Sequence, residues 1–473
     1  MIDADLVSHA VAAATRAGGD AADALQVASH SVEVRVRGEE VEHVTQAREH
    51  TLGLRVFVRG ARGRRTALVS TSDLAPDALE RLAGDAVAIA RATAEDPDAG
   101  LPADGFAADL PELSLLDPAD REAPVEARIA AAREAERAAR AVDPRIVNSE
   151  GSTASSSFAA VAFASSAGFS GCYEGAQHAL FASPVAAENG CMQTDWWMSA
   201  ARSLAGLDAA ESVGRRAAER ALAQLGARPV ATQDVPVIFE APAARGVLGN
   251  LVACLSGSAV YRRLSFLAGR LGERIASDAV TVIDDGRLAG GLGSRPFDGE
   301  GQATRRTVAV ERGRLASYLL DVYAARKLGL RSTGNAARAP ASAPSVGATN
   351  LWLAPGRDSL DELIRSTERG LLVTGLFGQG FNPVTGDFSR GARGFWIERG
   401  ERTHPVEEVT VAGSLADVLL GVDRVANDLL WLGSLGAPSF RVARMTVAGQ
   451  QAKRAARPRE GSPRGSRAET KAG

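Results

Sequence analysis

The stretch SVEVRVRGEEVEHVT, residues 31–45, sets the pattern for the first part of the chain. Apolar and polar residues alternate along it and are interrupted by Gly38, which is typical of two half-buried strands that meet at a turn. The stretch TLGLRVFVRGARGRRTALVSTS, residues 51–72, repeats the alternation and predicts two more strands, joined through Gly60 and Gly63. The beginning of the chain is therefore predicted to be rich in antiparallel strands.

Helices are predicted on both sides of these strands. Residues 4–15 repeat apolar side chains at helical spacing. Residues 76–95 predict a second helix, which ends before Pro97 because proline disfavours a helical predecessor. A connector rich in proline and glycine follows at 96–105, so residues 1–105 are predicted to form an N-terminal α/β subdomain.

Residues 106–228 predict a second α/β subdomain. A long helix rich in Ala, Glu and Arg is predicted at 124–142, and a second amphipathic helix at 209–226. Between them, small and aromatic residues alternate along 155–186, which indicates antiparallel strands.

Residues 229–449 contain many glycines and short strand-like segments, with helices predicted only at 243–254 and 358–370. The predicted fold class is therefore α+β, with a mixed α/β N-terminal region followed by a larger β-rich C-terminal domain. The polar, basic residues 450–473 predict a disordered tail with no nucleic-acid role.

The composition excludes several classes of protein. A net charge of −3 gives no basic surface for nucleic acid, and no apolar run reaches the ~18 residues of a membrane-spanning helix. The first residues lack the order of a secretory signal. The three cysteines are far apart and form no CxxC motif: Cys172, Cys191 and Cys254. We therefore expect a cytoplasmic protein without disulfides.

No metal site or catalytic group is predicted within this chain. The six histidines have no second His or Cys at zinc-ligand spacing, and no GxSxG motif is present. The adjacent acids Asp284 and Asp285, and the pair Asp298 and Glu300, are expected to form turns, because Asp side chains bond their own backbone there.

Three glycine-containing loops allow two interpretations. They are Ser332–Asn335, Gly378–Gly380 and Thr385–Asp387. Glycine at these positions is typical of tight turns between strands. The same loops also fit the edge of a groove that accepts an extended peptide by strand addition.

In their order along the chain, these segments resemble the TldD/PmbA protease family over nearly the whole length. The resemblance is carried by several motifs: residues 53–74, residues 88–102, FDGEG (297–301), STGNAAR (332–338), TNLWLAPG (349–356), residues 370–401 and ANDL (426–429). TldD-type members of this family carry a zinc motif that has no counterpart here around Gly249, Asn250 and Leu251, or in 431–442. The chain is therefore similar to the PmbA (TldE) type.

This resemblance implies a heterodimer in which a TldD-like subunit holds zinc and this chain holds none. It implies a role in enclosing the cleft and guiding unfolded peptides, such as antibiotic precursors or antitoxins. The residues expected to face peptide or partner are Thr333, Gly334, Asn335 and Arg338, with Gly378, Gln379 and Gly380. The alternatives are a hydrolase acting alone with unrecognised ligands and a peptide-binding protein without catalysis. A homodimer is also possible.

Overall fold

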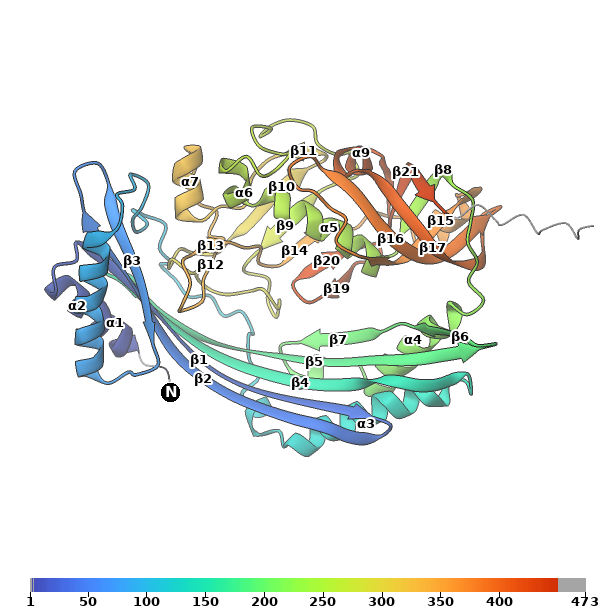
Figure 1. The fold of residues 1–473 in the computed structure, drawn as a ribbon, viewed down its shortest axis with the longest axis horizontal. Helices are drawn as coiled ribbons and strands as arrows, with labels where there is room; N and C mark the ends of the chain where they lie inside the picture. Colours follow the sequence, from blue (N-terminus) through green and yellow to red (C-terminus); the bar gives the residue numbers. More distant parts are fainter. Residues whose placement is uncertain (1, 3, 450–473) are drawn as a thin grey trace, which may run out of the picture.

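The computed structural model describes residue 2 and residues 4–449. The predicted disordered tail at 450–473 lies outside the described residues. Figure 1 shows a long curved sheet built from the first half of the chain, with the C-terminal domain above its open face. The predicted α+β class, with its strand-rich C-terminal region, is confirmed.

The curved sheet has seven strands in the order β3-β2-β1-β4-β5-β6, with β7 also paired to β5. All of its pairings are antiparallel. The strands are β1 (Ala21–Arg37), β2 (Glu40–Arg59), β3 (Arg64–Thr71), β4 (Ile146–Ser165), β5 (Ser170–Glu188), β6 (Cys191–Thr194) and β7 (Trp197–Ala201).

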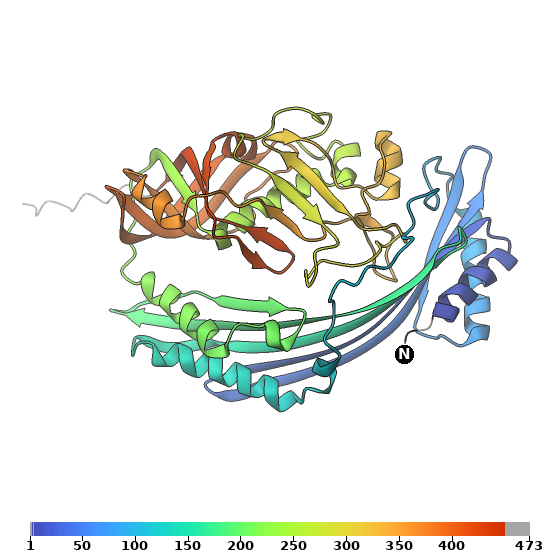
Figure 2. The ribbon, with the colours of Figure 1, turned by 180° about the vertical axis from the view of Figure 1, so that it is seen from behind.

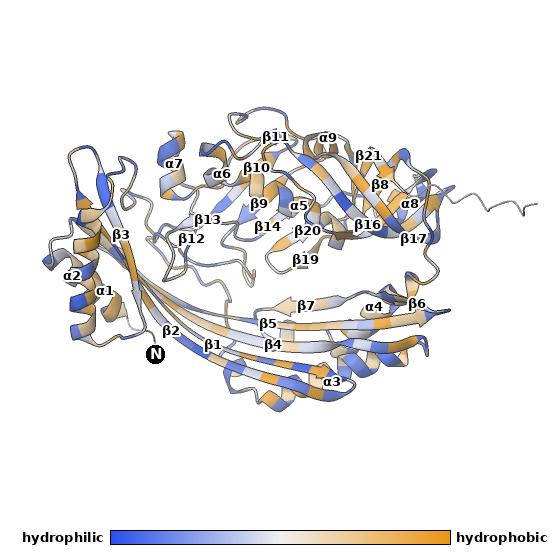
Figure 3. Ribbon diagram, in the orientation of Figure 1, coloured by the Kyte–Doolittle hydropathy of each residue, from blue (hydrophilic) through white to orange (hydrophobic). Residues whose placement is uncertain are grey.

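The alternation of residues along these strands places successive side chains on opposite faces of the sheet. Ala22 and Ala24 of β1 are buried against helices, whereas Asp23 and Leu25 between and after them face the C-terminal domain. Figure 3 shows hydrophilic and hydrophobic residues alternating along β1 and β2 near α3. The helices on the outer face are α1 (Ala4–Arg16), α2 (Pro76–Ala92), α3 (Val125–Ala141) and α4 (Ala210–Ala223). The helices α3 and α4 pack against each other and both contact β5; in Figure 2, α3 lies beneath the sheet and α4 in front of it.

One prediction about these strands is wrong. The segments 31–45 and 51–72 were expected to contribute four strands, but β2 runs without a break from Glu40 to Arg59. Its polar first part does not end the strand, because residues 40–51 pair with β1 apart from a bulge at Glu42. The division at residue 105 stays a prediction, although β1 is paired with β4 of the second segment.

The C-terminal domain contains two six-stranded sheets, β17-β16-β15-β8-β21-β18 and β11-β10-β9-β14-β20-β19. The first consists of β8 (Gln233–Phe239), β15 (Arg369–Phe377), β16 (Asp387–Glu398), β17 (Glu401–Ser414), β18 (Val422–Val425) and β21 (Phe440–Ala448). The second consists of β9 (Val282–Asp285), β10 (Arg306–Glu311), β11 (Arg314–Leu315), β14 (Leu351–Leu353), β19 (Leu430–Leu432) and β20 (Leu435–Ala437).

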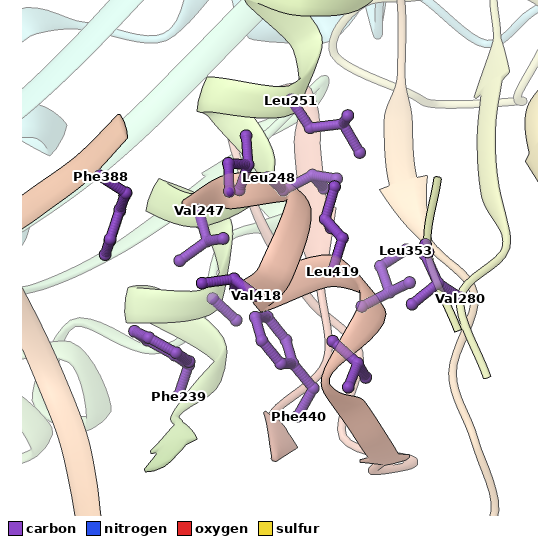
Figure 4. Packing of buried hydrophobic residues seen from close by; sticks show 14 of the residues in the cluster. Phe239, Val247, Leu248, Leu251, Val280, Leu353, Phe388, Val418, Leu419 and Phe440 are labelled. Carbon is purple, nitrogen blue, oxygen red and sulfur yellow. The ribbon is translucent and has the colours of Figure 1, made fainter. Parts of the chain in front are cut away.

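The helix α5 (Ala241–Leu255) packs inside this domain. Its residues Val247, Leu248 and Leu251 lie in one hydrophobic core with Phe239 and Phe440 (Figure 4). Its other side carries small and polar residues that are only half-buried: Arg245, Gly246, Gly249 and Asn250. One face of α5 therefore holds the domain together, and the other is free to line a cavity.

Several short elements escape sequence analysis. The helices α6 (Gly257–Tyr261), α7 (Val322–Leu328) and α9 (Leu415–Leu420) have too few turns to show a period, and α8 (Leu360–Arg365) is shorter than predicted. The two-residue strands β12 (Ala336–Ala337) and β13 (Ser345–Val346) pair with each other. Among the described helices, none is long and apolar enough to cross a membrane.

The curved sheet and the C-terminal domain are joined by close backbone contact and by buried charge. A Cβ atom at Gly53 of β2 would lie 1.8 Å from the carbonyl oxygen of Pro340, so only glycine fits there. Close by, a guanidinium nitrogen of Arg338 donates to a carboxylate oxygen of Asp23 at 2.7 Å. Both side chains are fully buried, so this ion pair fixes the C-terminal domain to the curved sheet at Asp23.

Candidate functional site

A large cavity lies between β7 and the C-terminal domain and has a volume of about 720 Å³. It is lined by β7 with the residues after it, by the loop between β9 and β10, by the turn between β19 and β20, by Asn350 and by the segment 114–118. Its lining residues include Ala200, Ala201, Arg202, Leu292, Asn350 and Trp431. A volume of this size lies in the range of sites that hold a ligand.

The polar side chains at this cavity hold its walls in place. Arg202 donates to the carbonyl oxygens of Gly291 and Leu292, at 3.0 and 2.7 Å. The amide of Asn350 donates to the carbonyl of Asp285 and accepts from the backbone of Gly293, at 2.7 and 2.8 Å. These two side chains are therefore occupied by contacts within the chain, and the other polar side chains in the lining are Ser114, Asp117 and Ser203.

Two strand edges border this cavity. In the described part of the chain, β7 pairs only with β5, so its other edge has no strand partner. The strand β19 is an edge of its own sheet and lies beside β7. An unpaired strand edge offers main-chain donors and acceptors to an extended peptide, whatever the peptide's sequence.

A second cavity, of about 210 Å³, lies at the other end of β7. Four arginines line it, and we call it the arginine pocket: Arg220, Arg245, Arg390 and Arg393. The other lining residues include Asp195, Trp196 and Trp197, together with Pro242, Ala243 and Gly246 of α5 and residues 374–377 of β15.

Two of the four arginines are paired with acids. Arg393 lies 2.7 Å and Arg220 3.3 Å from the carboxylate oxygens of Asp195, which is almost fully buried. Arg220 also bonds Glu240 at 2.9 Å. These ion pairs join β16 and α4 to the break between β6 and β7, and so give the arginine pocket a fixed wall.

The other two arginines have no acid beside them. Arg245 donates to the carbonyl of Leu432 at 2.9 Å, and Arg390 makes a long contact of 3.5 Å with the carbonyl of Phe377. Burial lowers the pKa of both, and no acidic group among the described residues raises it. Their positive charges are therefore uncompensated within the described part of the chain.

Three of the predicted site residues lie in one loop and make contacts inside the chain. The Thr333 hydroxyl accepts from the backbone of Leu320 at 2.7 Å and donates to the Asn335 side chain at 2.6 Å. The Asn335 amide donates to a carboxylate oxygen of Asp284 at 2.7 Å, and Asn335 is only 1% exposed. Gly334 has a φ of 73° and packs on the carbonyl of Ala303, which suits glycine.

Arg338 follows this loop and bonds Asp23 across to the curved sheet, as described above. Burial of Asn335 and of the Arg338 guanidinium gives both side chains a role inside the fold, and a peptide could not reach them in this structure. The loop therefore connects the two halves of the molecule.

The residues Gly378, Gln379 and Gly380 lie elsewhere, in the loop between β15 and β16, and are exposed. Gly378 has a φ of 76°, and the Gly380 carbonyl accepts from the backbone of Ser389 at 2.7 Å. The loop follows directly after Phe377, which lines the arginine pocket. That it faces peptide or partner stays a prediction.

The predicted acidic turns take two forms. Asp298 accepts from the backbone of Glu300 and Gln302 at 2.9 and 3.0 Å, as expected for a turn former. Asp284 instead points into the interior and accepts from Thr349 and Asn335. Burial raises the pKa of Asp284 to about 6. Burial and the neighbouring charge of Glu300 raise the pKa of Asp298 to about 7.

The positions expected to lack zinc ligands do not fit a metal ion. Leu251 points into the core, Gly249 has no side chain, and the amide nitrogen of Asn250 is buried with no hydrogen-bond partner in the described chain. Zinc needs thiolate, imidazole or carboxylate ligands, and residues 431–442 offer none of these. No group of three or more His, Cys, Asp or Glu within residues 4–449 is placed to hold a metal.

Neither β7 nor the arginine pocket is predicted from the sequence. The four arginines come from α4, α5 and β16, so no local motif joins them. The sequence feature that comes closest to indicating this pocket is the pair Arg390 and Arg393 among the mostly small and aromatic residues of DFSRGARGFWIE.

Comparison with known proteins gives consistent matches over most of the chain. Residues 22–90 match PmbA/TldA metallopeptidase domain 1, residues 118–225 its central domain, and residues 232–449 its C-terminal domain. The chain is 37% identical to metalloprotease PmbA of Escherichia coli O157:H7, covering 94% of this chain and 96% of that protein. It is 34% identical to a PmbA homologue of Haemophilus influenzae, covering 94% and 95%.

Solved structures show the same fold. A protein from Bacteroides thetaiotaomicron superposes with a TM-score of 0.86 at 29% identity, covering 94% of this chain and 98% of that one. TldE from Thermococcus kodakarensis superposes with a TM-score of 0.84 at 23% identity, covering 94% of this chain and 100% of that one.

Proposed function

The chain belongs to the PmbA/TldD family of metallopeptidases, and we propose that it is a subunit that binds no metal itself and guides unfolded peptides to the zinc of a TldD-like partner. One observation carries this proposal. The cavity of about 720 Å³ is bordered by the unpaired edge of β7, while the positions around Gly249–Leu251 carry no zinc ligand. The chain thus has the parts that hold a peptide without those that cleave it.

The chemistry of this division of work is straightforward. Hydrolysis by a zinc enzyme needs a metal that lowers the pKa of its bound water toward ~7 and polarises the scissile carbonyl. Positioning an extended peptide needs only main-chain hydrogen bonds and a fixed groove, which β7, β19 and the Arg202 contacts supply. This chain therefore orients the peptide, and the partner supplies the metal chemistry.

The proposed location is the cytoplasm. The three cysteines support it: all are free, and Cys254 is buried. Burial raises the pKa of the Cys254 thiol to about 12, so this cysteine packs in the core and does not act as a nucleophile.

The proposal is tested by purifying the chain alone and together with a TldD-like subunit, then measuring bound zinc and cleavage of an unfolded peptide. We expect a stable complex, zinc only in the partner, and cleavage that needs both chains. Stoichiometric zinc in the lone chain together with peptide cleavage would show an independent hydrolase. Peptide binding without any complex would show a binding protein that does not take part in cleavage.

A further inference from the structure

The arginine pocket has the properties of an anion site. Four guanidinium groups line it, against the single carboxylate of Asp195. Asp195 is already shared by Arg220 and Arg393, which leaves Arg245 and Arg390 without an anion. A half-buried cation without a counter-ion is unfavourable, and an incoming anion would relieve that cost.

The helix α5 adds to the positive potential. Its first turn, with Pro242 and Ala243, lines the pocket, and the amino end of a 15-residue helix carries partial positive charge. Arg390 reaches the second turn of α5, since one of its guanidinium nitrogens lies 3.7 Å from where a Cβ atom of Gly246 would stand. Two guanidinium groups and the helix end are therefore directed at the same small volume.

The size and place of the pocket indicate which anion it takes. Its volume of about 210 Å³ is below the ~300–1,000 Å³ of sites that enclose a whole small ligand. It lies at the Trp197 end of β7, whereas the larger cavity lies at the Ala201 end. A peptide extended along the unpaired edge of β7 would occupy the larger cavity and bring one end to the arginines.

We propose that the arginine pocket binds the carboxylate at the end of an extended peptide, with Arg245 and Arg390 as its binding residues. This inference rests on the proposed peptide-guiding function and adds a chemical preference to it. Main-chain pairing with β7 does not depend on the sequence of the peptide. The arginines would therefore fix the register of the bound peptide by holding its end. The carboxylate can belong to the C-terminus or to an acidic last side chain.

Three probes separate these sources of the carboxylate. Each is the same unstructured decapeptide of Ser, Thr, Val and Ala with a fluorescent label at its N-terminus. The first has a free C-terminal carboxylate, the second a C-terminal amide, and the third an amide with Glu as its last residue. Binding to the full-length chain is measured by fluorescence anisotropy at low salt.

We expect one or both carboxylate peptides to bind at least tenfold more tightly than the plain amide, since hydrogen bonds to charged groups are the strong ones. In Arg390→Gln and Arg245→Gln this ratio should fall toward one. Arg390 makes only one long hydrogen bond, so its loss leaves the fold intact, which a thermal melt verifies. Arg306→Gln is the matched control, because Arg306 is exposed on β10 outside the pocket and should keep the ratio.

The outcomes test the carboxylate site and the peptide-guiding function separately. Equal binding of all three peptides to the unmodified chain, or an unchanged ratio in both variants, would overturn the arginine pocket as a carboxylate site while leaving the peptide-guiding function standing. Binding of none of the peptides, by the chain alone or with a TldD-like partner, would overturn both.

Discussion

The hydroxyl oxygen of Ser156 lies 2.7 Å from Nδ1 of His178. On its other side, Nε2 of His178 lies 3.3 Å from a carboxylate oxygen of Asp120. These are the residue types of a serine hydrolase, but Ser156 is 1% and His178 0% exposed. Arg128 donates to the same hydroxyl at 2.8 Å, so Ser156 joins α3 to the sheet and no substrate can reach it.

Replacing Ser156 by alanine should therefore affect stability and leave function unchanged. We expect Ser156→Ala to lower the free energy of unfolding by about 1–3 kcal/mol, because Arg128 and His178 lose a buried partner. Urea denaturation measures this, with the exposed Ser157→Ala as control. A fluorophosphonate probe that labelled the native chain, but not the Ser156 variant, would contradict this view and indicate a serine hydrolase.

The contact between Asp23 and Arg338 should be one of the most costly to break. Burial raises the pKa of Asp23, but Arg338 and Arg55 outweigh it and hold that pKa below its usual range. Replacing Arg338 by methionine leaves a buried carboxylate with one partner fewer, which typically costs about 3–5 kcal/mol. Urea denaturation should show this loss, whereas the exposed Arg306→Met should change stability by less than about 0.5 kcal/mol.

Asp298 should make stability depend on pH near neutrality. Its folded-state pKa of about 7 is above the ~3.9 of an unfolded chain. The folded state therefore holds this proton more tightly, and the resulting stabilisation is complete below pH ~3.9 and is lost as the pH rises through about 7.

The measurement is urea denaturation of the native chain and of Asp298→Asn between pH 5 and 8. Relative to the variant, the native chain should gain about 1.4 kcal/mol for each pH unit below 7. Groups distant from Asp298, including His178, titrate equally in both and cancel. Asp285→Asn, at the half-buried last residue of β9, is the control. Stability curves that stay parallel for the native chain and Asp298→Asn would refute the prediction.

Strand addition to β7 makes a prediction about the peptide's own backbone. In an extended strand, only every second amide faces the neighbouring strand. N-methylation of alternate residues should weaken binding strongly in one set and slightly in the other. Anisotropy with the two sets of methylated peptides measures this, and equal effects of both sets would exclude pairing with a strand edge.

Much of the fold could be predicted, because long elements carry a clear period. The alternation along 31–45 and the helical spacing at 124–142 both correspond to observed elements, β1 with β2 and α3. The break predicted between residues 45 and 51 was wrong because pairing with β1 outweighs the polar sequence of β2. Short helices such as α7 depend on tertiary contacts, since its N-cap Asp321 is buried among residues distant in sequence.

The candidate site was less predictable. Ordered motifs were enough to indicate the family, and the missing ligands at Gly249–Leu251 could be read directly. The burial of Asn335 and Arg338 could not, because their partners Asp284 and Asp23 lie 51 and 315 residues away along the chain. The same applies to the arginine pocket, whose members meet only through the tertiary fold.

The pairing of β1 with both β2 and β4 has a consequence for synthesis on the ribosome. The β1–β2 hairpin can form as soon as residue 59 has emerged, but the second neighbour of β1 begins only at residue 146. Until then the nascent chain presents a 17-residue strand with one edge open, a template for unwanted association. The growing chain therefore needs protection, by a chaperone or by fast translation, over roughly a hundred codons.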